Sequence, residues 1–377
     1  METHTLQQVT QTEIAQVFSS EFPLQMECGV QFGPIDVAYE TYGTLNASSD
    51  NAILVCHALT GNAHAAGFSS NDPKTAGWWN SLIGVGKPLD TEKYFVVCSN
   101  FFGSCYGTTG SISENPKTGK PYGLDFPQMT VRDMVNVQKA LIDKLGIKKI
   151  KTVIGGSLGG MQVLEWTLLF PQLVESIIPI ATAAQHSPWA IALNAIARQA
   201  IMNDPAWQNG NYYNSIQPEN GLSLARQIAM LSYRSEQEFA ERFHRERIKV
   251  NGKDSTYRFD NENYFQSENY LRYQGKKLVN RFDANTYLYI SRAMDLHDVA
   301  ANRGELNDVL HTIDKPALCI GIDSDILYPV REQKQIAQYL PHSTYNEISS
   351  PYGHDAFLIE FEKVGNFVRE FFKKYSL

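Results

Sequence analysis

The fold is decided by a glycine-rich stretch, Val153-Ile154-Gly155-Gly156-Ser157-Leu158-Gly159-Gly160-Met161. It follows a short run rich in β-branched residues, 151–154, and it opens a helical pattern. A G-x-S-x-G motif between a strand and a helix is typical of a nucleophile elbow, a tight turn that raises a serine hydroxyl above a sheet. Side chains at Gly155 or Gly159 would collide with neighbouring elements, and we expect a strained backbone at Ser157. The helix N-terminus there favours a developing negative charge.

Outward from this turn, the sequence alternates between predicted strands and helices. Short apolar runs occur at Ala52–Cys56, 94–98, 151–154, 176–181, Ala317–Ile322 and 344–348. The clearest helical pattern covers 131–145, with Thr130 as a plausible N-cap and Gly146 as a plausible C-terminal stop. This alternation predicts an α/β fold with a mostly parallel central sheet and helices on both of its faces.

The alternation is interrupted once. From about Gln185 to Ala300 the sequence holds helical patterns, at 191–202, 222–233 and 237–247, without a convincing buried strand. The α/β pattern resumes at Lys315. We therefore expect a domain made of residues 1–184 and 301–377, with a helical insertion over 185–300. Near the N-terminus, 28–42 is predicted to form a β-hairpin with its turn at Gly33-Pro34.

The composition limits the classes of function. The 33 Lys and Arg against 40 Asp and Glu give a net charge of −7, which argues against a basic nucleic-acid-binding surface. No apolar stretch approaches the roughly 20 residues that span a bilayer, and the first residues do not have the pattern of a secretory signal. The five cysteines, Cys28, Cys56, Cys98, Cys105 and Cys319, are scattered and form no CxxC pair. We expect no disulfide framework, no zinc site and a reducing cytoplasmic location.

A serine nucleophile requires a base and an orienting acid, which follow it in this type of sheet in the order Ser, acid, His. The run Ala317–Ile322 leads into two carboxylates, Asp323 and Asp325. We favour Asp325 because it lies deeper in the loop, and Asp323 stays open as a turn former. Of the nine histidines, only His354 follows the last predicted strand, in a loop before an amphipathic C-terminal helix.

An acyl-transfer site also requires backbone donors for an oxyanion. One is the N–H of Leu158, directly after the serine. The loop after Ala52–Cys56 is the usual source of the second donor, and we choose the Leu59 N–H. His57, two residues earlier, is expected to brace this loop. This chemistry needs neither a metal nor a bound cofactor.

Beyond these residues, the sequence closely resembles the homoserine O-acetyltransferases of the MetX type, a family within the α/β-hydrolase superfamily. The matching segments are 57–61 (HALTG), 77–79 (GWW), 98–100 (CSN), 107–110 (GTTG), 115–119 (NPKTG), 155–161, 233–235 (YRS), 281–285 (RFDAN), 292–295 (RAMD) and 353–355 (GHD). They cover nearly the whole chain in order. One departure is Ser111, where the family usually has proline, which puts the rigidity of that loop in question.

The resemblance implies an α/β-hydrolase fold in which the helical insertion is a lid and two lids pack together in a homodimer. It places the family's nucleophile, acid and base on Ser157, Asp325 and His354. It also implies that Arg226, Tyr233 and Asp355 bind the amino-acid substrate. A guanidinium suits the α-carboxylate and a carboxylate suits the α-ammonium.

Two of these substrate-binding assignments have alternatives. The residues alone would make Arg226 a solvated helix arginine, and Arg234 is a competing candidate. Asp355 is also suitably placed to cap the last helix. Arg226 and Tyr233 are seven residues apart on a helical pattern, so they are expected to share one face.

The activity implied by the resemblance is transfer of acetyl from acetyl-CoA to the hydroxyl of L-homoserine, through an acyl-enzyme, in methionine biosynthesis. Acetyl-CoA is then a substrate rather than a cofactor. The rivals are succinyl transfer to homoserine or serine, a serine esterase or thioesterase, and a non-catalytic binding module. A succinyl group would require a cation near the acyl pocket. The 60–67 loop offers no Lys or Arg, which favours acetyl, and a cation from another loop stays open as an alternative.

Overall fold

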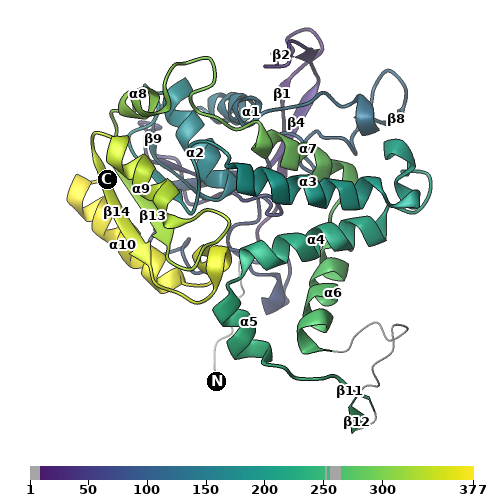
Figure 1. The fold of residues 1–377 in the computed structure, drawn as a ribbon. Coiled ribbons are helices and arrows are strands. Elements are labelled where there is room, and N and C mark those ends of the chain that lie inside the picture. The colour runs from purple at the N-terminus through teal and green to yellow at the C-terminus, as the bar shows by residue number, and fades with distance from the viewer. Residues whose placement is uncertain (1–8, 251–252, 255–264) are drawn as a thin grey trace, which may run out of the picture.

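A β-sheet forms the centre of the protein (Figure 1). The computed structural model describes residues 9–250, 253–254 and 265–377. In this part of the chain the main sheet contains β1 (Glu13–Phe18), β4 (Ile35–Tyr42), β5 (Ala52–Cys56), β6 (Phe95–Ser99), β9 (Ile150–Gly156), β10 (Ile177–Ile180), β13 (Ala317–Ile322) and β14 (Ser343–Ile348). Their order across the sheet is β1-β4-β6-β5-β9-β10-β13-β14. Neighbouring strands from β6 to β14 are parallel, which confirms the mostly parallel sheet.

Helices cover both faces of this sheet because its strands are apolar on both sides. Every residue of β5 and of β13 is buried. In β5, Leu54 faces a core that includes α1 (Val131–Lys144), α2 (Leu158–Leu169), α8 (Leu306–His311) and α9 (Val330–Tyr339). Its neighbours Ile53 and Val55 face the opposite core, which includes α10 (Phe361–Tyr375). All six strands that the sequence predicts are therefore present and are covered as an α/β fold requires.

The helix α1 begins where its capping signal predicts. The Thr130 hydroxyl accepts from the Asp133 N–H at 3.2 Å, and the Asp133 carboxylate accepts from the Thr130 N–H at 2.9 Å. This reciprocal pair is a capping box, which satisfies two N–H groups that the first helical turn leaves free. Gly146, with φ +72°, lies just beyond the helix end, as predicted.

The N-terminal hairpin prediction is wrong. The short strand β2 (Leu24–Gln25) pairs with β3 (Gln31–Phe32), so the hairpin turns before Gln31 rather than at Gly33-Pro34. The segment after Gly33-Pro34 is β4, which lies between β1 and β6 in the main sheet. Both edges of β4 are therefore occupied by other strands, and β3 is not its partner.

The insertion between β10 and β13 is helical. It contains α3 (Pro188–Met202), α4 (Glu219–Tyr233), α5 (Glu236–Phe243), α6 (Gln266–Val279) and α7 (Ala284–Asp295), with the short β11 (Lys249–Val250) and β12 (Lys253–Asp254). The third predicted helix ends at Phe243 rather than at residue 247. Helix α4 packs against both α3 and α6, and Figure 1 shows α3 and α4 running side by side.

Short elements complete the described fold. They are η1 (Pro73–Thr75), η2 (Gly123–Asp125), η3 (Pro205–Gly210), η4 (Gly353–Leu358), β7 (Glu114–Asn115) and β8 (Lys120–Pro121). No helix within the described ranges is both long enough and apolar enough to cross a membrane.

Candidate active site

Ser157 occupies the sharp turn between β9 and α2. Its backbone has φ 59° and ψ −125°, a region that non-glycine residues rarely adopt. The turn is held in place because the Ser157 N–H donates to the Ile180 carbonyl at 2.9 Å and its own carbonyl accepts from the Thr182 hydroxyl at 2.8 Å. The strained conformation expected of a nucleophile elbow is thus present.

The two flanking glycines allow this turn to approach β5. A Cβ atom on Gly155 would lie 2.6 Å from the Cys56 carbonyl oxygen, and one on Gly159 would overlap the same oxygen. Both contacts involve backbone, which cannot move aside as a flexible side chain does. The prediction that both positions require glycine is confirmed.

Asp325, rather than Asp323, contacts the predicted base. The Asp325 carboxylate lies 2.6 Å from His354 Nδ1, with both side chains almost fully buried. Its second oxygen accepts from the backbone N–H groups of Leu327 and Tyr328 at 2.8 and 2.9 Å. The Asp323 carboxylate instead accepts from the Ser350 N–H at 3.0 Å and stabilises the loop.

His354 lies in η4 and not in a loop as expected, with its ring enclosed by aromatic side chains. The ring centroids of Tyr328, Phe357 and Tyr233 are 5.3, 5.6 and 5.7 Å away. Burial alone would lower the pKa of His354, but the charge and hydrogen bond of Asp325 outweigh it and the pKa is raised. With Nδ1 engaged by Asp325, Nε2 is the ring nitrogen left for proton transfer.

Ser157 and His354 line the same cavity, of about 540 Å³. The cavity also contains Leu59, Arg226, Tyr233 and Asp355. Within the described residues, the backbone N–H groups of Leu59 and Leu158 donate to no protein acceptor, so both are free to bind a ligand oxygen. The structure therefore brings the predicted nucleophile, base, second oxyanion donor and amino-acid-binding residues to one place.

His57 stays outside this chemistry. Its ring is buried, lies 4.4 Å from the Phe101 ring in a stacked arrangement, and is hydrogen-bonded to the Ala58 carbonyl at 2.8 Å. Burial lowers its pKa to about 4, so the ring is neutral at physiological pH. The expectation that His57 braces the loop is confirmed.

Of the two arginines that the sequence offers for the substrate carboxylate, Arg226, which lies in α4, lines the cavity. Its guanidinium carbon is 5.3 Å from the centre of the Tyr233 ring, as the shared helical face predicts. None of the described carboxylates forms an ion pair with it. Arg234, the competing candidate, is instead paired with Asp355 at 3.1 Å and with Glu238 at 3.2 Å. The charge of Arg234 is already compensated, so of these two candidates Arg226 is the one without a carboxylate partner among the described residues.

Asp355 belongs to η4, whereas the N-cap of the last helix is Glu360. It therefore does not cap α10, the alternative left open by the sequence. The Asp355 carboxylate is held by Arg234 and borders the cavity, which leaves it near any ammonium group bound beside His354.

Several cavity residues were missed by sequence reasoning. Lys74, Lys277 and Arg281 supply three cations, and His64 and Trp78 line the same space. They come from separate segments with no common periodicity, so only the matching GWW and RFDAN segments, which include Trp78 and Arg281, pointed towards them. Among the residues described, no cluster of three His, Cys, Asp or Glu side chains is placed to hold a metal.

Comparisons with known proteins agree with this geometry. The alpha/beta hydrolase fold family matches residues 51–361. A homoserine O-acetyltransferase of Carboxydothermus hydrogenoformans is 51% identical over 360 residues, which are 93% of each chain. This chain belongs to the homoserine O-acetyltransferase family. A crystal structure of the family member from Bacillus anthracis, 31% identical, superposes with a TM-score of 0.88 over 97% of this chain and 98% of that one.

The homoserine O-acetyltransferase family also has structural relatives that are hydrolases. The crystal structure of esterase E22 is 31% identical and has a TM-score of 0.86, covering 96% of this chain and all of that one. The same scaffold thus carries enzymes named for transfer and for hydrolysis. Because the scaffold itself does not separate transfer from hydrolysis, the side chains that could bind an acceptor bear on which of the two reactions takes place.

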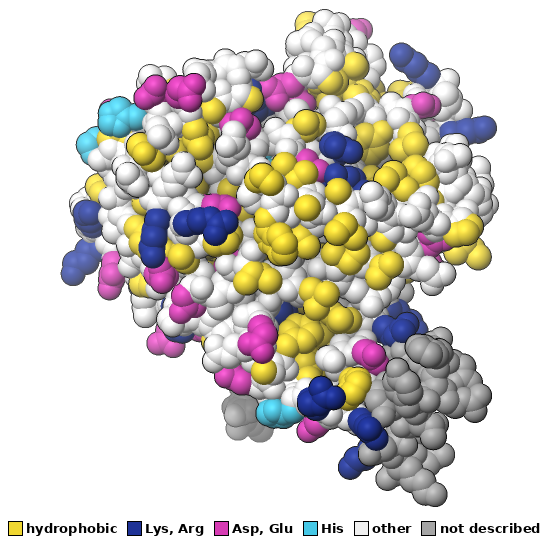
Figure 2. All heavy atoms as spheres, in the orientation of Figure 1, with side chains coloured by type: hydrophobic (Ala, Val, Ile, Leu, Met, Phe, Trp, Pro, Cys, Tyr) yellow, Lys and Arg dark blue, Asp and Glu magenta, His cyan; other side chains and the backbone are white. Residues whose placement is uncertain are grey.

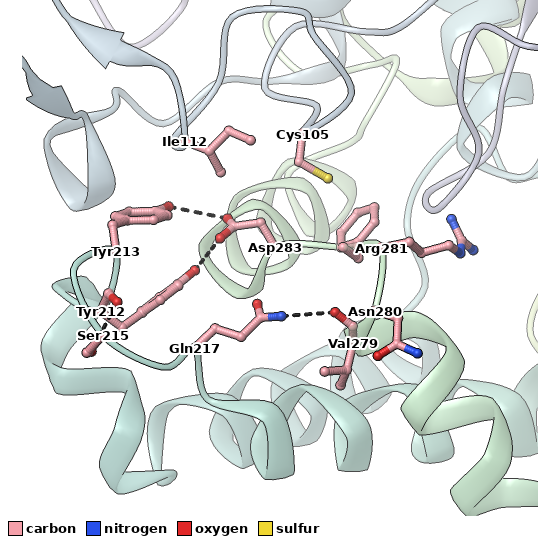
Figure 3. A pocket seen from close by; sticks show the side chains of 11 residues that line it. Cys105, Ile112, Tyr212, Tyr213, Ser215, Gln217, Val279, Asn280, Arg281 and Asp283 are labelled. Carbon is pink, nitrogen blue, oxygen red and sulfur yellow. Dashed lines mark hydrogen bonds between the residues drawn. The ribbon is translucent and has the colours of Figure 1, made fainter.

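A second cavity, of about 470 Å³, is lined in part by residues of the segment 281–285 (Figure 3). Asp283 caps α7, since its carboxylate accepts from the Thr286 N–H at 2.7 Å, and it also accepts from the Tyr212 hydroxyl at 2.5 Å. Ser111, the residue that replaces the family proline, is buried with its hydroxyl 3.4 Å from Asp283. The loop is therefore fastened by a hydrogen bond where the family usually has proline.

Proposed function

We propose that this protein acetylates the hydroxyl of L-homoserine with acetyl-CoA, through an acetyl-Ser157 intermediate. The observation that carries the proposal is that one cavity holds Ser157 and His354 beside Arg226 and Asp355. A nucleophile and base alone would serve any ester. An unpaired guanidinium and a carboxylate beside them suit an acceptor that carries both an α-carboxylate and an α-ammonium.

In the first half-reaction, His354 removes the Ser157 proton and the serine oxygen attacks the thioester carbonyl. Asp325 holds the imidazole in the required tautomer and stabilises the imidazolium that forms. The N–H groups of Leu59 and Leu158 stabilise the tetrahedral oxyanion. The thiol of CoA then leaves with the proton from His354, and the acetyl group stays on Ser157.

In the second half-reaction, homoserine binds with its carboxylate on Arg226 and its ammonium near Asp355. Tyr233 packs against the Arg226 guanidinium and restricts its position. The homoserine hydroxyl, deprotonated by His354, attacks the carbonyl of acetyl-Ser157. The Ser157 oxygen then leaves with the proton from His354, and O-acetyl-L-homoserine is released with the free enzyme restored. The same base serves both half-reactions, and the covalent acetyl-Ser157 between them makes the mechanism ping-pong.

The helical insertion supplies two of the three acceptor-binding residues, and the third, Asp355, lies in η4. Both Arg226 and Tyr233 lie in α4, inside the insertion, whereas Ser157 follows a strand of the sheet. We propose that residues 185–300 act as a lid on a domain made of 1–184 and 301–377, although 1–8, 251–252 and 255–264 lie outside the described residues. Such a lid places the homoserine hydroxyl at the acyl-enzyme ahead of water.

The test is thiol release from acetyl-CoA and succinyl-CoA, each with homoserine, serine or no acceptor. We expect fast release only from acetyl-CoA with homoserine. Equally fast release without an acceptor would identify a hydrolase, the alternative favoured by the likeness to esterase E22. The lack of cations in the 60–67 loop no longer argues against succinyl, because Lys74, Lys277 and Arg281 line the cavity from other segments.

Replacing Arg226 with alanine should separate the two half-reactions. Loss of two charge-assisted hydrogen bonds should lower kcat/KM for homoserine by about 100-fold. The burst of acetyl-Ser157 formation, followed by rapid-quench mass spectrometry, should keep its rate because the donor does not use this guanidinium. Arg272→Ala, an exposed arginine of α6, is the control. Equal loss in both half-reactions would contradict the role of Arg226.

We also propose that the protein is a homodimer joined through α3 and α4. Trp189, Ile196, Leu224 and Leu231 on these helices are each about half exposed, at 53, 53, 48 and 53%. Figure 2 shows hydrophobic side chains gathered in a band across the face where Figure 1 places these two helices. An exposed apolar patch of this kind is typical of a surface covered by a partner.

Charge placed in this patch should prevent dimer formation. We expect the Ile196→Asp/Leu224→Asp double variant to sediment as a monomer, whereas Val85→Asp, at an exposed apolar residue elsewhere, should sediment like the parent protein. A monomeric parent protein at micromolar concentration, or a dimeric double variant, would contradict this interface.

The cytoplasmic location expected from the scattered cysteines stays a prediction.

A further inference from the structure

The cavity at Ser157 is strongly cationic although the chain is acidic. Its lining contains four Lys or Arg side chains, Lys74, Arg226, Lys277 and Arg281, and one carboxylate, Asp355. The net charge of the whole chain is −7, so the average surface has the opposite sign. A concave site lined by one sign of charge focuses its field and attracts a ligand of the opposite sign.

Three of these cations have no role in the two half-reactions described above. Lys74 lies in η1, Lys277 lies in the last turn of α6, and Arg281 lies just beyond the end of that helix. Both Lys277 and Arg281 line the cavity at Ser157, so the end of α6 brings two cations to it. In the described part of the chain, neither lysine has an ion-pair partner.

Arg281 is held in place without losing its charge. Its guanidinium donates to the Thr60 carbonyl at 2.8 Å and to the Tyr106 hydroxyl at 2.5 Å, both neutral acceptors. Figure 3 shows its side chain pointing away from Asp283 and from the two tyrosines that bind that carboxylate. The guanidinium therefore belongs to the Ser157 cavity rather than to the carboxylate two residues later.

The cavity has a buried end and an exposed end. Ser157 and His354 are 4% and 3% exposed, whereas Lys74, Lys277 and Arg281 are exposed. A ligand that reaches both ends requires a reactive group at the buried end and several negative charges at a distance from it. An acetyl thioester of a phosphorylated nucleotide has this distribution, with its acetyl at one end and its phosphates at the other.

We propose that Lys74, Lys277 and Arg281 form the subsite for the nucleotide phosphates of acetyl-CoA. This inference rests on the proposed function and names the part of the cavity that the donor occupies. The two lysines act as mobile point charges, and the fixed Arg281 offers the planar donor pair that suits a phosphate. Arg226 then remains free for the amino-acid carboxylate.

The experiment compares two donors in each variant, acetyl-CoA and S-acetyl-N-acetylcysteamine, which lacks the nucleotide. For the Lys74→Ala/Lys277→Ala variant, the ratio of kcat/KM for acetyl-CoA to that for the short donor should fall at least tenfold, through KM for acetyl-CoA. Lys277→Glu should lower the ratio further. Lys276→Ala removes the adjacent exposed lysine, which does not line the cavity, and should keep the parent ratio.

Salt supplies an independent readout of the same subsite. KM for acetyl-CoA should rise with ionic strength more steeply in the parent enzyme than in the double variant, because fewer phosphate contacts remain to be screened. A double variant with the parent ratio and salt dependence, or a Lys276→Ala variant with an equal loss, would overturn the subsite. Failure of the parent protein to acetylate homoserine with either donor would instead overturn the proposed function.

Discussion

Replacing Ser157 with alanine should lower the rate of homoserine acetylation by about 10⁴- to 10⁶-fold, because the serine oxygen carries the acetyl group between the two substrates. Alanine is smaller than serine, and the substitution removes no hydrogen bond of the hydroxyl that stabilises the fold. The elbow should therefore stay intact. The measurement is thiol release from acetyl-CoA with saturating homoserine, alongside the thermal unfolding temperature.

A matched substitution separates chemistry from packing. Ser111 is another buried serine, and its hydroxyl contacts Asp283 rather than the cavity at Ser157. Ser111→Ala should therefore retain most of the activity. A Ser157→Ala protein that is folded and transfers acetyl within tenfold of the parent rate would refute the covalent mechanism.

Replacing Asp325 with asparagine should lower kcat by about 10⁴-fold, since an amide at this position favours the wrong tautomer of His354. The change should also move the pH profile. His354 acts as a base only when neutral, so activity is lost as the pH falls through its pKa. Asp325 is the main cause that raises this pKa against burial. In Asp325→Asn the acid limb of kcat/KM should therefore shift to lower pH.

Asp323 supplies the control for this prediction. Asp323→Asn keeps the loop hydrogen bond from the Ser350 N–H, because the amide oxygen accepts equally well, and it should change neither kcat nor the acid limb by much. If Asp323→Asn lost as much activity as Asp325→Asn, or if the acid limb of Asp325→Asn moved to higher pH, the assignment of the acid would be wrong.

The central sheet was predictable because burial on both faces leaves a clear trace in the sequence. Strands such as β5 and β13 are continuous apolar runs bounded by polar positions, and the bounds that the pattern predicts are those of the structure. The N-terminal hairpin failed for a different reason. Pairing of β4 with β1 and β6 is decided by tertiary contacts. A Gly-Pro dipeptide indicates a turn, but it does not indicate which strands pair with each other.

The nucleophile, acid and base of the candidate site were predictable because their chemistry requires them in a fixed order along the chain. A serine on an elbow, an acid after a late strand and a histidine after the last strand follow a fixed order in this fold, so Asp325 and His354 could be chosen. The cations Lys74 and Lys277 had no such constraint. Exposed lysines are common, and only the fold shows that these two share a cavity with Ser157.

The most direct test of the account is intact-protein mass spectrometry after mixing with acetyl-CoA in the absence of homoserine, followed by peptide mapping. We expect a mass increase of one acetyl group, located on Ser157, which disappears when homoserine is added and O-acetylhomoserine forms. An enzyme that acetylates homoserine at full rate without ever carrying acetyl on Ser157 would contradict the account.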